Sequence, residues 1–127
     1  MNKILVVDDD QESRDLLCEV LEANGYAVCA VQDGMEAREV LREDGNCRIV
    51  IADLQMPNES GLELLRKLRQ QNWKHELILM SSFISAAERK LANELGAYAL
   101  LDKPFRLTEL LQTVAEVAAK HPIGISS

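Results

Sequence analysis

The sequence predicts a single α/β domain with an open, parallel, five-stranded sheet and five helices on its two faces. Short apolar runs recur at even intervals, at residues 4–7, 26–31, 49–52, 77–80 and 98–101. They are continuous rather than alternating, as in parallel strands that are covered on both faces. Segments with helical spacing separate them. The chain has 127 residues, of which 47% are hydrophobic, which suits one domain with one core.

Helix and turn signals follow the strands in order. Asp10, after the first run, is a residue type that begins helices, and Gly25 is expected to end the first helix. Asp33 and Gly34 predict a turn after the second run, and Gly96 is expected to end the fourth helix. The last helix has the clearest apolar face, which comprises Leu107, Leu110, Leu111, Val114 and Ala118. Alternating strands and helices form right-handed βαβ units, so we expect a flavodoxin-like, doubly wound sheet of strand order 2-1-3-4-5.

Charge and composition exclude several classes of function. The net charge is -7, and a field of this sign repels nucleic acid and anionic membrane surfaces, so we expect neither partner. No apolar run approaches the roughly 18 residues that span a bilayer, and we expect a cytoplasmic protein. The three cysteines lack paired spacing and are read as reduced packing residues. We expect the domain to occupy residues 1–120, with residues 121–127 as a tail or the start of a linker.

Reactive side chains lie at the ends of four of the predicted strands. Asp8 and Asp9 follow the first strand, Asp53 the third, Ser81 the fourth, and Lys103 comes just after the fifth. In an open α/β sheet the carboxyl edge is where ligands bind. With the first and third strands adjacent, the three aspartates converge, and Ser81 and Lys103 flank them from one side.

Each of these residues also has a purely structural interpretation. A lone aspartate after a strand is commonly a helix N-cap, as we expect for Asp10, and Ser81 or Ser82 could begin the next helix. Their joint placement on four strand ends favours a site. Three carboxylates about 5 Å apart, at an effective dielectric of about 20, repel by roughly 3 kcal/mol per pair. A hard divalent cation relieves this repulsion, and Mg²⁺ also binds phosphate oxygens, so the cluster predicts a Mg²⁺ site that acts on phosphoryl groups.

These residues and their neighbours resemble the motifs of response regulator receiver domains over nearly the whole chain. The matching segments are residues 6–9, residues 53–57 followed by Gly61, residues 80–82, residues 96–97 and residues 103–105. The resemblance implies that Asp53 is the phosphoacceptor. It also implies that Asp9 and Asp53 bind Mg²⁺ directly, that Asp8 acts through water, and that the Gln55 backbone carbonyl completes the protein ligands.

The resemblance also assigns residues that respond to phosphorylation. Lys103 is expected to contact the phosphoryl group and to precede a cis Lys103–Pro104 bond. Ser81 is expected to hydrogen-bond a phosphoryl oxygen and to draw its loop inward. Leu100 occupies the position of the family's usual aromatic switch residue, while Tyr98 lies two positions earlier and is expected on the same face of the strand. Phe83 occupies a position that tunes phosphoryl lifetime in this family, and it is expected to restrict attacking water.

The resulting hypothesis is a phosphorylation-dependent switch of a two-component system. A sensor histidine kinase donates the phosphoryl group, and the domain catalyses only its own phosphorylation and dephosphorylation. An output domain or downstream protein is expected on the surface of the fourth helix, fifth strand and fifth helix, which is also compatible with a homodimer that forms on phosphorylation.

Three alternatives remain open at the level of the sequence. The first is a degenerate receiver that binds a partner without being phosphorylated. The second is a phosphohydrolase of the haloacid dehalogenase type, whose motif requires Thr or Val where this chain has Glu12. The third is a flavodoxin-like carrier, although aspartates after the first strand would repel its phosphate.

Overall fold

The computed structural model describes residues 3–56 and 59–120. The predicted tail at residues 121–127 and Pro57 of the third-strand motif lie outside the described residues. Among the helices that are described, none is long and apolar enough to cross a bilayer.

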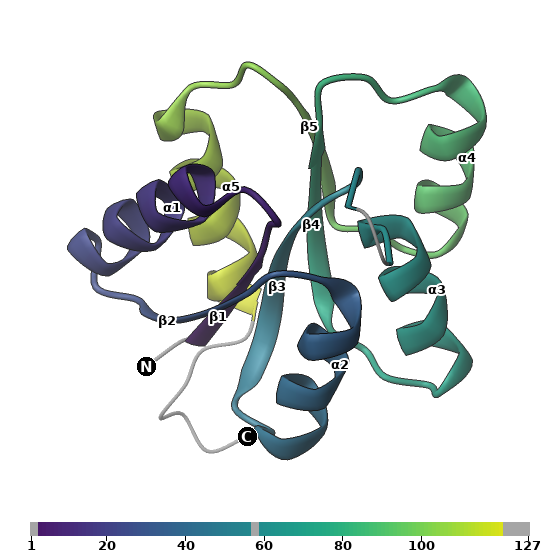
Figure 1. The fold of residues 1–127 in the computed structure, drawn as a ribbon, viewed down its shortest axis with the longest axis horizontal. Coiled ribbons are helices and arrows are strands. Elements are labelled where there is room, and N and C mark those ends of the chain that lie inside the picture. Colours follow the sequence, from purple (N-terminus) through teal and green to yellow (C-terminus); the bar gives the residue numbers. More distant parts are fainter. Residues whose placement is uncertain (1–2, 57–58, 121–127) are drawn as a thin grey trace.

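The sheet has the predicted composition and order. Its five parallel strands run in the order β2-β1-β3-β4-β5, which confirms the predicted fold class (Figure 1). The strands are β1 (Lys3–Val7), β2 (Ala27–Val31), β3 (Cys47–Asp53), β4 (Glu76–Ser81) and β5 (Ala99–Asp102). Each predicted run falls within one or two residues of a strand. Asp53 and Ser81 are the last residues of their strands rather than the first residues beyond them, because their backbones still pair with the neighbouring strands.

Helices cover both faces of this sheet. They are α1 (Gln11–Ala23), α2 (Gly34–Glu43), α3 (Gly61–Gln70), α4 (Ala86–Glu94) and α5 (Leu107–Lys120). Figure 1 shows α1 and α5 on one face and α2, α3 and α4 on the other. Side chains alternate between two core clusters along the strands, so that Leu5 and Val7 pack toward α2 and α3 while Ile4 and Val6 pack toward α1 and α5.

Polar side chains begin the helices, and glycines end two of them. Asp10 caps α1 by accepting a hydrogen bond from the Ser13 amide, as predicted. Asp33 also caps a helix, because its side chain accepts from the Glu36 amide, and the predicted turn at Asp33 and Gly34 is therefore wrong. Gly25 and Gly96 follow α1 and α4 at φ angles of 91° and 80°, which confirms them as the residues that end these helices.

The last helix differs from its predicted apolar face at one end. Leu110 and Val114 are buried against the sheet, as predicted, but Leu107 is exposed. Leu107 is the first residue of α5, before the helix packs on the sheet, so periodicity alone overestimated its burial. The three cysteines are unpaired, in agreement with the sequence.

Candidate functional site

The register of the sheet brings the predicted site residues to one edge. Val7 pairs with Ala52, so Asp8 follows β1 directly beside Asp53 at the end of β3. Asp53 pairs with Met80, and the next residue of β4 is Ser81. The Lys103 amide then donates to the Ser81 carbonyl at 2.8 Å, which places Lys103 just beyond the end of β5. The strand ends therefore converge as the sequence predicted.

The three aspartates form an acidic cluster at this edge. Carboxylate oxygens of Asp8, Asp9 and Asp53 all lie within 4.8 Å of one another. Asp8 is 1% exposed and Asp53 is 7% exposed, whereas Asp9 is open to solvent. Buried carboxylates this close repel one another and need a compensating positive charge.

Asp8 is the most constrained of the three. One of its oxygens accepts a hydrogen bond from the Asp10 amide at 3.0 Å. The other oxygen, Oδ2, is buried without a hydrogen-bond partner. Burial, together with the nearby Asp53 charge, raises the pKa of Asp8, although hydrogen bonds from Asp10 and Ser13 and the charge of Lys103 oppose this. The Oδ2 atom of Asp8 is therefore the oxygen on which a cation or a proton would bind.

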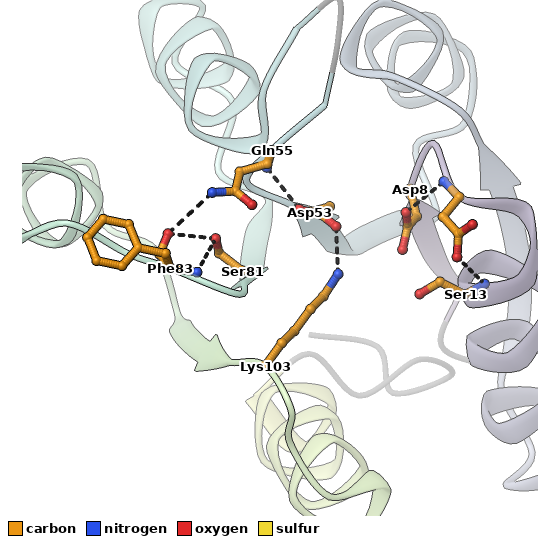
Figure 2. Close-up of polar contacts among 8 residues, drawn as sticks. Asp8, Ser13, Asp53, Gln55, Ser81, Phe83 and Lys103 are labelled. Atoms are coloured by element: carbon orange, nitrogen blue, oxygen red, sulfur yellow. Dashed lines mark hydrogen bonds and ion pairs between the residues drawn. The ribbon is translucent and has the colours of Figure 1, made fainter.

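Asp53 is held from two sides. Its Oδ2 lies 2.7 Å from the Lys103 ammonium, and its Oδ1 accepts a hydrogen bond from the Gln55 amide at 2.8 Å. Figure 2 shows Lys103 reaching Asp53 from the end of β5, with Asp8 and Gln55 on different sides of Asp53. The Lys103–Pro104 bond is cis, which confirms the prediction. The arrangement places an ammonium and a backbone donor on a carboxylate that borders a potential cation site.

Ser81 is buried beside this pair but is turned toward its own loop. Its hydroxyl donates to the Phe83 carbonyl at 2.8 Å and accepts from the Phe83 amide at 3.2 Å (Figure 2). The Gln55 side-chain amide approaches the same carbonyl at 3.5 Å. The helix that follows begins with Ser85 as its N-cap, so neither Ser81 nor Ser82 has that structural role.

The predicted switch residues differ in their surroundings. Phe83 is 66% exposed, and Leu100 is partly buried against the core cluster beneath α2, α3 and α4. Tyr98 packs instead against the cluster on the α1 and α5 side, where the Lys120 ammonium lies 4.8 Å from its ring centroid. The expectation that Tyr98 shares a face with Leu100 is wrong, because Tyr98 precedes β5 and strand alternation does not apply to it.

Two further residues near the site were not identified from the sequence. Arg14 of α1 donates from Nη1 to the Asp8 carbonyl at 2.7 Å and so holds the backbone of the acidic turn. Glu59, in the loop after β3, is a buried carboxylate. An arginine in the first helix and an acid beside a helix cap are both ordinary surface patterns, so the sequence contains no signal for either contact.

The donor set fits a hard divalent cation. The ligands available are carboxylate oxygens, two of them on buried residues, and the Asp8 Oδ2 atom lacks any other partner. Oxygen donors of this kind suit Mg²⁺, which binds one or two carboxylates and retains several waters. Gln55 lies two residues after Asp53 and donates its amide to the Asp53 carboxylate, so this residue belongs to the same edge.

Comparisons with known proteins agree with this geometry. A family model described as the response regulator receiver domain matches residues 4–115. The transcriptional regulatory protein CpxR of Escherichia coli K12 is 38% identical over 117 residues, which are 92% of this chain and 49% of CpxR. The response regulator MprA of Mycolicibacterium vanbaalenii is 39% identical over 109 residues, which are 86% of this chain and 47% of MprA. The chain thus spans about half the length of the curated relatives it matches.

A solved structure shares the fold over the whole domain. The response regulator protein TrrA of Thermotoga maritima, determined in complex with Mg²⁺ and BeF, is 32% identical with a TM-score of 0.81. The match covers 92% of this chain and 99% of that chain.

Proposed function

Because the chain belongs to the response regulator receiver domain family, we propose that it is a phosphorylation-dependent switch in which Asp53 accepts a phosphoryl group. The observation that supports this assignment is the position of the Asp53 carboxylate, between an acidic pair and the Lys103 ammonium. We assign the receiver domain to residues 1–120, which includes the segment that the family model matches.

Asp8, Asp9, Asp53 and the Gln55 carbonyl are the residues that would hold Mg²⁺. When bound, this ion neutralises negative charge on the aspartates and on the transferring phosphoryl oxygens. TrrA was determined in complex with Mg²⁺ and BeF, which supports Mg²⁺ as the ion bound by this chain.

The chain's own groups account for the transfer. An Asp53 carboxylate oxygen forms a bond to phosphorus while the bond between phosphorus and the donor's leaving atom, an imidazole nitrogen in a histidine kinase, breaks. The Lys103 ammonium, now on Asp53 Oδ2, can pair with a phosphoryl oxygen as charge moves outward. The product is an acyl phosphate, whose hydrolysis returns the carboxylate and free phosphate. The domain therefore acts on itself and is a regulatory protein.

Ser81 links the site to the surface. To reach a phosphoryl oxygen, its hydroxyl must leave the Phe83 carbonyl, and this exchange of partners moves the loop that leads to α4. Phe83 is an exposed residue of this loop, where it would restrict the water that attacks the acyl phosphate. We assign the responding surface to α4, β5 and α5, and its partner to an output domain or downstream protein. The surface would equally serve a homodimer, and we place the domain in the cytoplasm.

The comparisons do not favour the alternative functions. The receiver model matches residues 4–115, and the curated relatives reported above are regulators of the same family. A degenerate receiver is disfavoured by the three clustered aspartates and by the lysine beside Asp53, because these are the groups that an acceptor site requires.

Mass spectrometry of the intact protein tests the proposal. We expect incubation with a small phosphodonor, such as acetyl phosphate, and Mg²⁺ to add one phosphate. Asp53→Asn should abolish the adduct, because an amide is a poor nucleophile toward phosphorus. Asp102→Asn is a matched control, since Asp102 ends β5, two strands away from Asp53 in the sheet, and pairs with Arg89 instead. An adduct on Asp53→Asn would contradict the assignment, and turnover of phosphoesters would indicate a hydrolase.

A further inference from the structure

The loop between β3 and α3 contains a buried carboxylate outside the acidic cluster. Glu59 is 2% exposed. Its Oε2 accepts from Arg38 Nε at 3.0 Å, and its Oε1 accepts from Arg38 Nη2 at 3.0 Å and from Lys67 Nζ at 2.6 Å. Arg38 belongs to α2 and Lys67 to α3, so one carboxylate joins the loop to two helices.

These bonds keep Glu59 ionised in a buried position. Burial raises its pKa, but the hydrogen bonds and charges of Arg38 and Lys67 outweigh burial, and the pKa lies below its usual value. The two-pronged contact with the Arg38 guanidinium is a geometry that fixes orientation as well as distance. The side chains of Arg38 and Lys67 are 22% and 37% exposed, so they can regain water if Glu59 is replaced.

The start of α2 leaves space for this carboxylate. A Cβ atom on Gly34 would lie 2.7 Å from Glu59 Oε2 and 2.9 Å from Glu59 Cγ. Gly34 is the first residue of α2, and any larger side chain there must displace Glu59. The glycine is thus required by close approach of the Glu59 side chain.

The same loop also packs on the backbone and carboxylate of Asp53. At its beginning, the Gln55 amide donates to Asp53 Oδ1 at 2.8 Å, and Met56 is buried in the core. Directly after the loop, a Cβ on Gly61, the first residue of α3, would lie 2.8 Å from the Asp53 carbonyl oxygen. Glu59 lies between these two contacts and ties the loop to α2 and α3.

We propose that Glu59, held by Arg38 and Lys67, is a positioning residue that keeps Gln55 in the geometry that cation binding and phosphorylation of Asp53 require. The inference rests on the proposed function of Asp53. Under this proposal α2 acts on the phosphorylation site indirectly, through the contact of Arg38 with Glu59. Among the described residues, no side chain of α2 reaches Asp53 through a hydrogen bond or ion pair.

Two variants disturb the contacts of Glu59 with Arg38 and Lys67, here called the anchor, in different ways. Glu59→Gln removes the charge, and Gly34→Ala retains every charge but displaces the Glu59 side chain. The control for Glu59→Gln is Glu39→Gln, which alters an exposed acid of α2. The control for Gly34→Ala is Gly45→Ala, where an added Cβ meets nothing within 4 Å. Amide exchange of Gln55 and of the core residue Ile51 is measured by NMR in chelator, and Mg²⁺ affinity by calorimetry, at a temperature where every variant is folded.

We expect both anchor variants to raise the Gln55 exchange rate several-fold more than that of Ile51, and to weaken Mg²⁺ binding about tenfold, as is common for residues that orient a metal ligand. Phosphorylation should recover at saturating Mg²⁺, and the controls should match the parent. Equal changes in exchange at Gln55 and Ile51 would indicate global destabilisation and overturn the inference. So would unchanged Mg²⁺ affinity. A parent protein that neither binds Mg²⁺ nor forms an adduct would contradict the proposed function, and this inference with it, before any variant is compared.

Discussion

Asp8 connects burial, proton binding and cation binding at a single carboxylate. It is 1% exposed, and its Oδ2 atom has no hydrogen-bond partner. Burial raises its pKa above the usual value for an aspartate. A proton and a divalent cation therefore compete for the same oxygen. Because the pKa is raised, the proton begins to displace the cation at a higher pH than it would on an ordinary aspartate.

This competition predicts a pH-dependent Mg²⁺ affinity. As the pH falls through the raised pKa of Asp8, Mg²⁺ must displace a proton, and we expect the affinity to fall by up to about tenfold per pH unit. Calorimetric Mg²⁺ titrations at a series of pH values measure this. Asp8→Asn should bind Mg²⁺ more weakly and lose that part of the pH dependence. Asp15→Asn, on the exposed face of α1, is the control. An identical pH profile in the Asp8→Asn variant would show that another group takes up the proton.

Elements that the sequence could predict are those in which backbone and side-chain patterns agree. The apolar runs of the five strands and the glycines after α1 and α4 lie where expected, because parallel strands and helix ends restrict the residues they accept. The acidic cluster was also predictable, since Asp8 and Asp53 lie at the ends of adjacent strands.

What the sequence could not indicate are contacts between side chains of different elements. Glu59 reaches Arg38 and Lys67 through the packing of a loop on two helices, and no spacing along the chain encodes that distance. Tyr98 was misassigned because β5 begins one residue later than its apolar run. Asp33 was read as a turn residue because aspartate followed by glycine is common in turns and at helix starts alike.

The response of α4 and β5 depends on which residue links them to Asp53. Ser81 contacts the loop before α4 through two hydrogen bonds to Phe83, and it must exchange these to bind a phosphoryl oxygen. Leu100 lacks a hydroxyl and is partly buried in the present arrangement, so it offers little difference in free energy between two states. We therefore assign the coupling to Ser81.

This assignment gives opposite expectations for two substitutions. Leu100→Ala should change the phosphorylation rate of Asp53 by less than about threefold, or roughly 0.7 kcal/mol in activation free energy. Ser81→Ala should remove the phosphorylation-dependent NMR shifts of α4 and β5. Ser82→Ala, an exposed neighbour, is the control for Ser81→Ala. If Leu100→Ala removes those shifts while Ser81→Ala retains them, the coupling runs through β5 instead.

For the whole molecule, the acidic cluster that would bind Mg²⁺ also lowers the stability of the metal-free domain. The net charge is -7, and three of the acids are gathered within 4.8 Å at one edge of the sheet. At this distance and an effective dielectric of about 20, one pair repels by about 3 kcal/mol, which the single Lys103 ammonium offsets only in part. The metal-free domain should therefore be less stable than its core alone would allow.

Removing one acid should consequently stabilise the metal-free protein. Asp8→Asn keeps an oxygen that can accept from the Asp10 amide, and Asp9→Ala alters an exposed residue, so both relieve repulsion at little structural cost. We expect the melting temperature in chelator to rise by roughly 3 to 6 °C for each kcal/mol gained. Asp53→Asn should raise it less, because this substitution also breaks the ion pair with Lys103. Glu39→Gln is the control, since it removes an exposed charge that does not belong to the cluster.

Mg²⁺ should narrow the difference in stability between the parent and the variants. At ten times its dissociation constant, Mg²⁺ should add about 1.4 kcal/mol to the unfolding free energy of the parent. It should add less to that of the variants, because each of them has lost one carboxylate of the cluster. Calorimetric melting curves in chelator and at two Mg²⁺ concentrations compare these states directly. Melting temperatures in chelator that are unchanged or lower in both Asp8→Asn and Asp9→Ala would mean that repulsion among the three aspartates contributes little. The metal affinity of the acidic cluster would then come from the fixed positions of its oxygen atoms alone. The contacts of Glu59 with Arg38 and Lys67, which we propose to fix Gln55, would then contribute more to Mg²⁺ binding.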